Sequence, residues 1–191
     1  MPLRLNRPRD RQECRRKLGL PRDAKLIGTA GGLYADKGVG KLYEAFARIA
    51  PGDPAVHLVL AGPADAALPP PTHDRVHYLG SLAHESVAEL FCALDVGVIY
   101  LRDTPFGRFC FPQKAYEMLA CTLPVVAANI GAMGSLFAGA PECLYRADDS
   151  ADLARQITTQ LELRAIPSVR IDDWVGIVGE FDAQLRELVD S

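Results

Sequence analysis

Short apolar runs alternate with amphipathic segments along most of this chain, and the alternation predicts its fold. We expect buried strands at 26–30, 56–61, 76–80, 95–101, 123–128 and 143–145. The segments between these runs carry apolar residues at helical spacing. Because strands separated by helices need crossover connections, they should lie parallel in one sheet with helices on both faces. This is the doubly wound, Rossmann-like α/β class.

The same periodicity places the helices between the strands. They are expected at 9–18, around 39–46, at 84–94, from 112 to about 120, from 150 to about 165, and from 172 or 173 onward. Pro112 suits a first helical position because its missing N–H has no partner in the first turn. Ser150 is expected to cap the next helix and Asp172 or Asp173 the last. The apolar face of that last helix would consist of Trp174, Ile177, Val178, Phe181, Leu185 and Leu188.

Length and composition limit the possible classes of protein. A chain of 191 residues suits one domain, which we expect over 25–191, after a basic linker and leading helix over 1–24. No apolar run is long enough to span a bilayer, and the N-terminus does not resemble a signal peptide. Five isolated cysteines and four scattered histidines show no metal-ligand spacing. We therefore expect free thiols, a cytoplasmic protein and no metal site.

Charge is distributed unevenly along the chain. Residues 1–22 carry eight basic and two acidic residues, a balance of +6, whereas the whole chain has a net charge of −3. One interpretation is a solvated, arginine-rich helix. The other is a basic edge that faces anionic lipid in a peripheral membrane contact. Nucleic acid is disfavoured as a partner because no aromatic residues interleave with the basic ones.

The helix and strand at 112–128 hold the most informative residues. Lys114 and Glu117 are three positions apart and therefore share one helix face. This helix follows the strand at 95–101 across the loop 102–111, so its N-terminus should open near the carboxyl edge of the sheet. Open α/β sheets bind ligands at that edge, and a helix N-terminus there favours phosphate.

A family resemblance is carried by Pro112-x-Lys114-x-x-Glu117-Met118-Leu119-Ala120-Cys121-x-x-Pro124-Val125-Val126-Ala127. This pattern resembles the signature of family 4 glycosyltransferases, and the similarity extends from about residue 26 to the last helix. The resemblance implies the C-terminal, donor-binding domain of a two-domain GT-B enzyme, which retains anomeric configuration without a metal or other cofactor. It also implies a UDP- or GDP-sugar donor, a saccharide or lipid-linked acceptor, and an N-terminal GT-B domain as partner. An enzyme with a lipid-linked acceptor would work at the inner face of the membrane.

The stretch 31–38 resembles the family's glycine turn after the first strand. Gly31 and Gly32 would let backbone amides approach an anion, and Lys37 would add a point charge as a phosphate-binding and catalytic residue. The family commonly has an arginine where this chain has Gly32. A dinucleotide fingerprint is the competing interpretation, but Leu33 stands where its third glycine belongs. A solvent-exposed Lys37 is the other alternative.

The resemblance also assigns roles to residues further along the chain. Glu117 would accept hydrogen bonds from the ribose hydroxyls, and Lys114 would serve as the second catalytic and phosphate-binding cation. Backbone groups near Leu82 would contact the base. Two further roles follow from position in the chain: Phe111 would line the pocket from the loop 102–111, and Gly131, at a helix start near the carboxyl edge of the sheet, would complete the phosphate cradle. The alternatives are a Glu117–Lys114 ion pair and ordinary turns at Leu82 and Gly131.

Other residues of the loop 102–111 bear on the strength of the site. Arg102 and Arg108 are either anion partners or surface residues. The family's carboxylate beside the transferred sugar is replaced by Phe109, which weakens the expectation of sugar contacts.

Two classes of function follow. The first is the donor-binding domain of a retaining glycosyltransferase, which the intact 112–126 block favours; a GT-B nucleotide-sugar epimerase is its close variant. The second is a non-catalytic nucleotide-sugar-binding or regulatory module of the same fold, which Gly32 and Phe109 favour.

Overall fold

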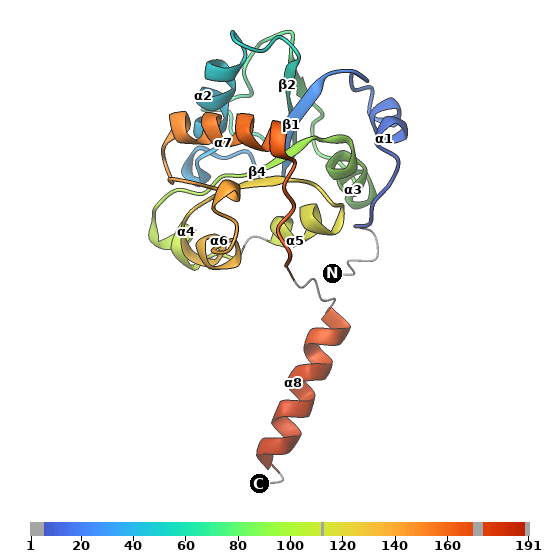
Figure 1. Cartoon of the computed structure of the whole chain (residues 1–191), viewed down its shortest axis with the longest axis vertical. Coiled ribbons are helices and arrows are strands. Elements are labelled where there is room, and N and C mark those ends of the chain that lie inside the picture. Colours follow the sequence, from blue (N-terminus) through green and yellow to red (C-terminus); the bar gives the residue numbers. More distant parts are fainter. Residues whose placement is uncertain (1–5, 112, 170–173, 190–191) are drawn as a thin grey trace.

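Six parallel strands form a single sheet in the computed structural model, which describes residues 6–111, 113–169 and 174–189. The strands are β1 (Lys25–Ala30), β2 (Val56–Ala61), β3 (Val76–Tyr78), β4 (Val96–Ile99), β5 (Val125–Ala128) and β6 (Leu144–Tyr145). Their order across the sheet is β3-β2-β1-β4-β5-β6, and each neighbouring pair is parallel (Figure 1). The predicted doubly wound, Rossmann-like class is confirmed.

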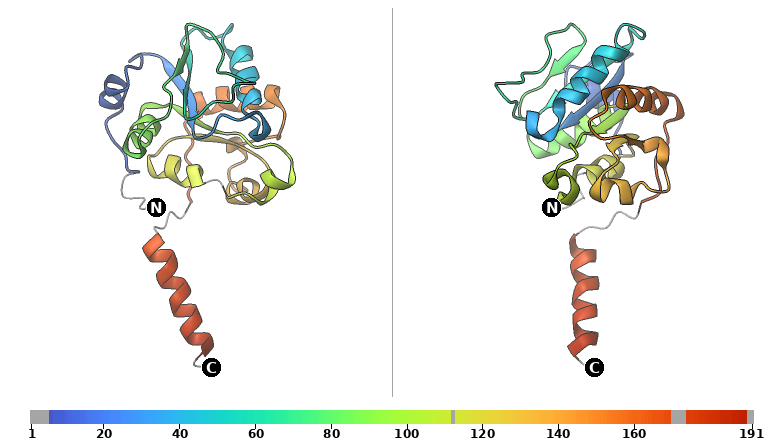
Figure 2. Two further views of the ribbon diagram at one scale, coloured as in Figure 1. Left: turned by 180° about the vertical axis from the view of Figure 1, so that it is seen from behind. Right: turned by 90° about the vertical axis from the view of Figure 1, so that its left-hand side faces the viewer.

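Helices cover both faces of this sheet (Figures 1 and 2). They are α1 (Arg11–Lys17), α2 (Val39–Ile49), α3 (His84–Ala93), α4 (Pro105–Phe109), α5 (Gln113–Ala120), α6 (Gly131–Leu136), α7 (Ser150–Leu163) and α8 (Trp174–Val189). Helices α2 and α7 pack together on one face, whereas α3 packs against both α1 and α5 on the other. The central strands β4 and β5 are buried along their whole length because both of their faces are covered.

Several boundaries differ from the sequence prediction. Asp149, not Ser150, caps α7, because its carboxylate accepts hydrogen bonds from the amides of Ala151 and Asp152. The predicted loop 102–111 contains the short helix α4, which Thr104 caps by accepting from the amide of Gly107. The predictions for Pro112 and for Asp172 or Asp173 lie outside the described residues.

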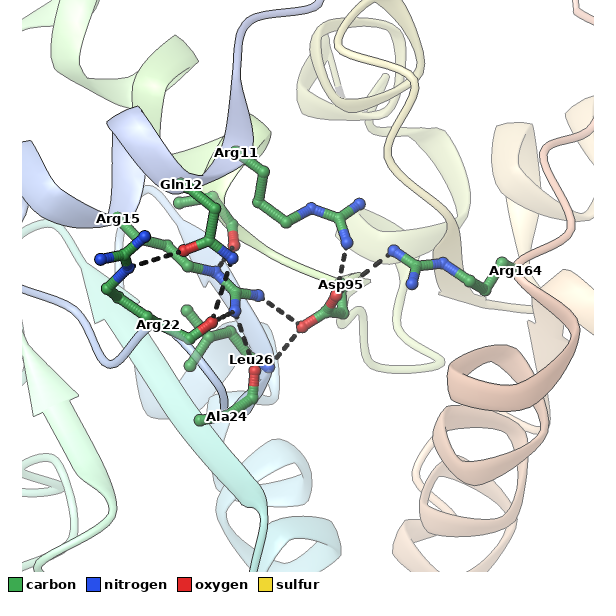
Figure 3. Close-up of polar contacts among 9 residues, drawn as sticks. Arg11, Gln12, Arg15, Arg22, Ala24, Leu26, Asp95 and Arg164 are labelled. Atoms are coloured by element: carbon green, nitrogen blue, oxygen red, sulfur yellow. Dashed lines mark hydrogen bonds and ion pairs between the residues drawn. The ribbon is translucent and has the colours of Figure 1, made fainter.

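Helix α1 is packed into the domain through its arginines (Figure 3). The Arg15 side chain is only 4% exposed and donates to Asp95 and to the carbonyls of Ala93, Arg22 and Ala24. Cys14 of the same helix and the following Leu20 belong to the main hydrophobic core. The predicted boundary between 1–24 and 25–191 therefore falls inside one continuous core.

Helix α8, from Trp174 to Val189, confirms the predicted last helix. It extends away from the sheet in each view (Figures 1 and 2), and Val175, Val178, Phe181, Leu185 and Leu188 are exposed. Within the described residues, no helix combines the length and the apolar character that a bilayer crossing requires.

Candidate functional site

The strand order creates a crevice between β1 and β4. The chain leaves β1 for α2 on one face of the sheet and leaves β4 for α5 on the other. Such a switch point, at the carboxyl ends of the strands, is where open α/β sheets bind ligands. The turn at 31–32, Tyr100 and the start of α5 all follow the strands that border this crevice. The prediction that the helix beginning near residue 112 opens at the carboxyl edge of the sheet agrees with this topology.

Three turns at this edge are joined through their glycines. Gly31 adopts a φ of +114°, and its amide donates to the carbonyl of Ala61 over 2.9 Å. A Cβ atom on Gly62 would lie 2.1 Å from the carbonyl oxygen of Gly31, so the two turns can approach only because Gly62 has no side chain. The amide of Gly62 in turn donates to the carbonyl of Gly80 over 2.7 Å. The turns after β1, β2 and β3 are thus linked to one another by backbone hydrogen bonds along this edge.

The turn after β1 offers fewer amides to an anion than its sequence suggests. The amides of Gly31 and Leu33 donate to the carbonyls of Ala61 and Pro63. Among the hydrogen bonds of the described residues, the amide of Gly32 is the one of these three that has no protein acceptor. A Cβ atom at Gly32 would lie 2.3 Å from the ring of Tyr34. The Tyr34 ring therefore fills the space of the arginine that the family commonly carries here.

Two lysines from distant parts of the sequence converge on this turn. A Cβ atom on Gly31 would lie 3.6 Å from Nζ of Lys114, which in turn lies 4.9 Å above the ring centroid of Tyr100. Nζ of Lys37 lies 5.1 Å from the ring centroid of Tyr34. Burial and, next, the nearby charge of Lys37 lower the pKa of Lys114 to about 8.

Neither lysine forms an ion pair with a carboxylate within 4 Å in the described part of the chain, so their charges remain open to an anionic ligand. Both ammoniums instead lie over aromatic rings. Among the described residues, the site therefore combines two lysine ammoniums that have no carboxylate partner with the Gly32 amide, which has no protein acceptor. Its chemistry suits a diphosphate.

Glu117 lies further along α5 and is partly buried. Burial raises the pKa of its carboxyl group, whereas the charges of His84 and Lys114 oppose this shift. The alternative of a direct Glu117–Lys114 ion pair is not found in the structure, which leaves the carboxylate available to hydroxyl groups. His84 begins α3, and its Nε2 atom is buried without a hydrogen-bond partner in the described structure. The sequence analysis did not single out this histidine, because an isolated histidine carries no spacing signal.

The loop 102–111 brings aromatic residues to the same side. Phe111 is 61% exposed and stacks on Tyr116 of α5, with 5.3 Å between ring centroids. Phe109 is 88% exposed. Arg102 pairs with Asp148 over 3.2 Å and Arg108 with Asp103 over 2.6 Å, so both arginines are engaged as surface residues.

The remaining two candidates lie at turns with a packing role. Gly131 has a φ of +49°, and a Cβ atom there would lie 2.2 Å from the carbonyl oxygen of Arg108. Its lack of a side chain therefore permits α6 to approach the loop 102–111. Leu82 is half-buried and packs against the core after the Gly80 turn. The phosphate role of Gly131 and the base contact near Leu82 remain predictions.

The fold and the candidate site define an open parallel α/β domain of the doubly wound class, in which Lys37 and Lys114 lie near the switch point between β1 and β4. More closely, the chain belongs to the glycosyl transferases group 1 family, whose profile matches residues 24–188. It is 32% identical over 179 residues to a D-inositol 3-phosphate glycosyltransferase of Geodermatophilus obscurus. The aligned region covers 84% of this chain and 38% of that relative. The chain thus spans about two fifths of the length of the curated relatives it matches.

Solved structures with the GT-B architecture share the fold. A sucrose-phosphate synthase from Thermosynechococcus elongatus superposes on 100% of this chain and 51% of its own, with a TM-score of 0.75 and 25% identity. HepE of Anabaena, crystallised with UDP-glucose, superposes on 85% of this chain and 46% of its own, with a TM-score of 0.68 and 25% identity. The family expected from the 112–127 motif is confirmed, and the chain has the size of one Rossmann-like half of a GT-B protein.

Proposed function

We propose that this chain binds the nucleotide-sugar donor of a glycosyl transfer reaction. The observation that carries the proposal is the convergence of Lys37 and Lys114 on the turn at 31–32, without a carboxylate partner in the described residues. The diphosphate would lie between the two ammoniums, with Glu117 toward the ribose and Phe111 at the pocket wall. The structure of HepE with UDP-glucose supports a UDP-sugar as the donor.

The arrangement suits a retaining reaction that does not depend on a metal. Departure of the nucleoside diphosphate places negative charge on its β-phosphate, and fixed cations in a partly buried site stabilise such charge before it develops. Lys37, Lys114 and the amide of Gly32 would supply this stabilisation. The acceptor, a saccharide or a lipid-linked saccharide, would be held by an N-terminal GT-B domain across the cleft.

Titration with nucleotides tests the donor site directly. We expect UDP- or GDP-sugars to raise the thermal unfolding temperature, whereas uridine should do so weakly. A ligand at 100 times its dissociation constant adds about 2.7 kcal/mol of stability. Lys37→Ala should reduce diphosphate affinity about tenfold to a hundredfold and leave nucleoside binding unchanged, because it removes a charge-assisted contact.

The matched control is Lys41→Ala on α2, where Lys41 pairs with Glu44 at 3.0 Å. This variant should bind like the unchanged chain. Equal losses for UDP and uridine in Lys37→Ala, or no loss for either, would remove Lys37 from the site.

A second candidate function is a non-catalytic nucleotide-sugar-binding module. The exposed Phe109 stands where the family carries a carboxylate beside the sugar, and the Tyr34 ring occupies the place of its usual arginine. Such a module would bind the donor as tightly but would add nothing to transfer when combined with an acceptor-binding domain.

A further inference from the structure

Tyr100 lies beneath the diphosphate site at the end of β4 and touches both of its halves. The side chain is 2% exposed. Its ring centroid lies 4.9 Å from Nζ of Lys114. Its hydroxyl donates a hydrogen bond of 2.9 Å to the carbonyl of Gly32. One buried residue therefore connects the cation of α5 with the turn that follows β1.

We propose that Tyr100 is a positioning residue of the donor site, which seats the Lys114 ammonium above its ring and fixes the turn at 31–32 through the Gly32 carbonyl. This inference rests on the proposed function, since it assigns the geometry of the same diphosphate site. The 112–127 motif does not contain Tyr100.

The contact with the Tyr100 ring explains how the partly buried Lys114 can remain available to a ligand. A carboxylate beside Lys114 would stabilise its charge but would also neutralise it toward a phosphate. The face of an aromatic ring attracts the ammonium more weakly and leaves its outer N–H groups free. Around Lys114, Lys37 disfavours the charged form, whereas Glu117 and Cys110 favour it only in part.

The hydroxyl of Tyr100 acts on the other half of the site. Among the described residues of this turn, the amide of Gly32 has no hydrogen-bond acceptor. The orientation of the Gly32 peptide group therefore decides whether its N–H can donate to an anion. Glycine has no Cβ atom, so its backbone can adopt many conformations. The hydrogen bond from Tyr100 to the Gly32 carbonyl reduces this freedom before a ligand arrives.

Two substitutions separate the contributions of the ring and the hydroxyl. Affinity for UDP-glucose would be measured by calorimetry between about pH 6 and pH 9. Tyr100→Phe keeps the ring, so we expect a loss of about threefold to tenfold at every pH, with an unchanged pH profile. Tyr100→Leu also loses the cation–π contact, which lowers the pKa of Lys114. Its affinity should begin to fall about half a pH unit to one unit earlier as the pH rises.

The chain offers a matched control in Tyr43, a buried tyrosine whose hydroxyl has no hydrogen-bond partner among the described residues. Tyr43→Phe should bind like the unchanged chain. The proposal is overturned if Tyr100→Phe binds equally well, or if Tyr100→Leu leaves the pH profile unmoved.

A second measurement does not depend on the ligand. NMR titration of the Lys114 side chain in the free protein should show a lower pKa in Tyr100→Leu than in the unchanged chain, and an equal pKa would overturn the role of the ring. Absence of UDP-sugar binding by the unchanged chain would instead contradict the proposed function, and the two failures are therefore distinguishable.

Discussion

Lys114 differs from an ordinary surface lysine because its charge is tuned by its surroundings. Burial is the first cause of its lowered pKa, and repulsion from Lys37 is the second. A bound diphosphate would reverse the second effect, because it places negative charge between the two ammoniums. The proton on Lys114 is thereby linked to ligand binding.

This linkage predicts proton uptake. The pKa of Lys114 in the free chain is about 8, and a bound diphosphate should raise it. Above about pH 8 the free lysine loses its proton while the bound one keeps it, so affinity should fall by up to about tenfold per pH unit. UDP-glucose is the suitable ligand, because its diphosphate does not titrate in this range.

Calorimetry at about pH 8.5 in two buffers of different ionisation enthalpy would measure the proton taken up. Lys114→Arg serves as the control, because arginine stays charged in this range and should abolish the uptake. Binding without proton uptake in the unchanged chain would contradict the prediction.

Glu117 gives a second prediction at the same scale. We propose that its carboxylate accepts hydrogen bonds from the ribose hydroxyls. Substitution Glu117→Gln should then weaken nucleotide binding by about 1–2 kcal/mol. A 2′-deoxynucleotide already lacks one hydroxyl, so Glu117→Gln should weaken its binding less. Such non-additivity indicates a direct contact.

The affinities of UDP and 2′-deoxy-UDP for both forms of the chain would be compared. Glu85→Gln, at an exposed position of α3, controls for a simple change of charge. Equal losses for the two nucleotides would mean that Glu117 does not touch the ribose.

At the scale of elements, Asp95 ties three segments together at the amino ends of β1 and β4 (Figure 3). It accepts from Arg15 over 2.7 Å, from Arg11 over 2.8 Å and from Arg164 over 3.3 Å. It also accepts from the backbone amide of Leu26 over 2.8 Å. Helix α1, the sheet and the end of α7 therefore share one carboxylate, on the edge of the sheet opposite the proposed donor site.

Removing this carboxylate should destabilise the whole domain. Asp95→Ala leaves the buried guanidinium of Arg15 without its counter-charge, and breaking a buried pair in this way costs about 3–5 kcal/mol. Urea unfolding would measure the change in the free energy of unfolding. Glu13→Ala breaks an exposed pair with Arg16 on the same helix and should lower the free energy of unfolding far less than Asp95→Ala, because solvent screens exposed charges. Similar small losses for both variants would show that α1 is only loosely attached.

At the scale of the whole molecule, the basic residues of the N-terminal segment are largely used within the fold. Besides the pairs with Asp95, Arg9 and Lys17 both pair with Glu89 of α3. These pairs favour the interpretation of a structural, partly solvated helix over that of a lipid-binding edge. The apolar face of α8, in contrast, is left exposed within the described structure.

We predict that this chain alone binds a UDP-sugar but transfers no sugar. Glycosyl transfer needs an acceptor held opposite the donor, and the chain spans 38% of a full-length relative such as the D-inositol 3-phosphate glycosyltransferase. Radiolabelled UDP-glucose with a panel of saccharide and lipid-linked acceptors would measure transfer, with nucleotide binding checked in the same preparation. Measurable transfer by the purified chain would refute the prediction.

The sequence by itself determined the class of fold and the family. Apolar runs and helical periodicity report local burial, and burial on both faces of short strands occurs in parallel sheets with crossover helices. The motif at 112–127 placed Lys114 and Glu117 on one helix face, which α5 bears out. Local patterns failed where neighbouring residues compete for one role, as when Asp149 rather than Ser150 caps α7.

Only the tertiary structure decided how the site is assembled. Lys37 and Lys114 lie on different crossover connections, and their convergence depends on β1 and β4 being neighbours in the sheet. The contact between the Lys114 ammonium and the Tyr100 ring could not be predicted from the sequence for the same reason. In the sequence, Tyr100 is one more apolar residue at the end of a predicted strand. A linear pattern records which residues are buried, whereas strand order and backbone approach decide which of them meet.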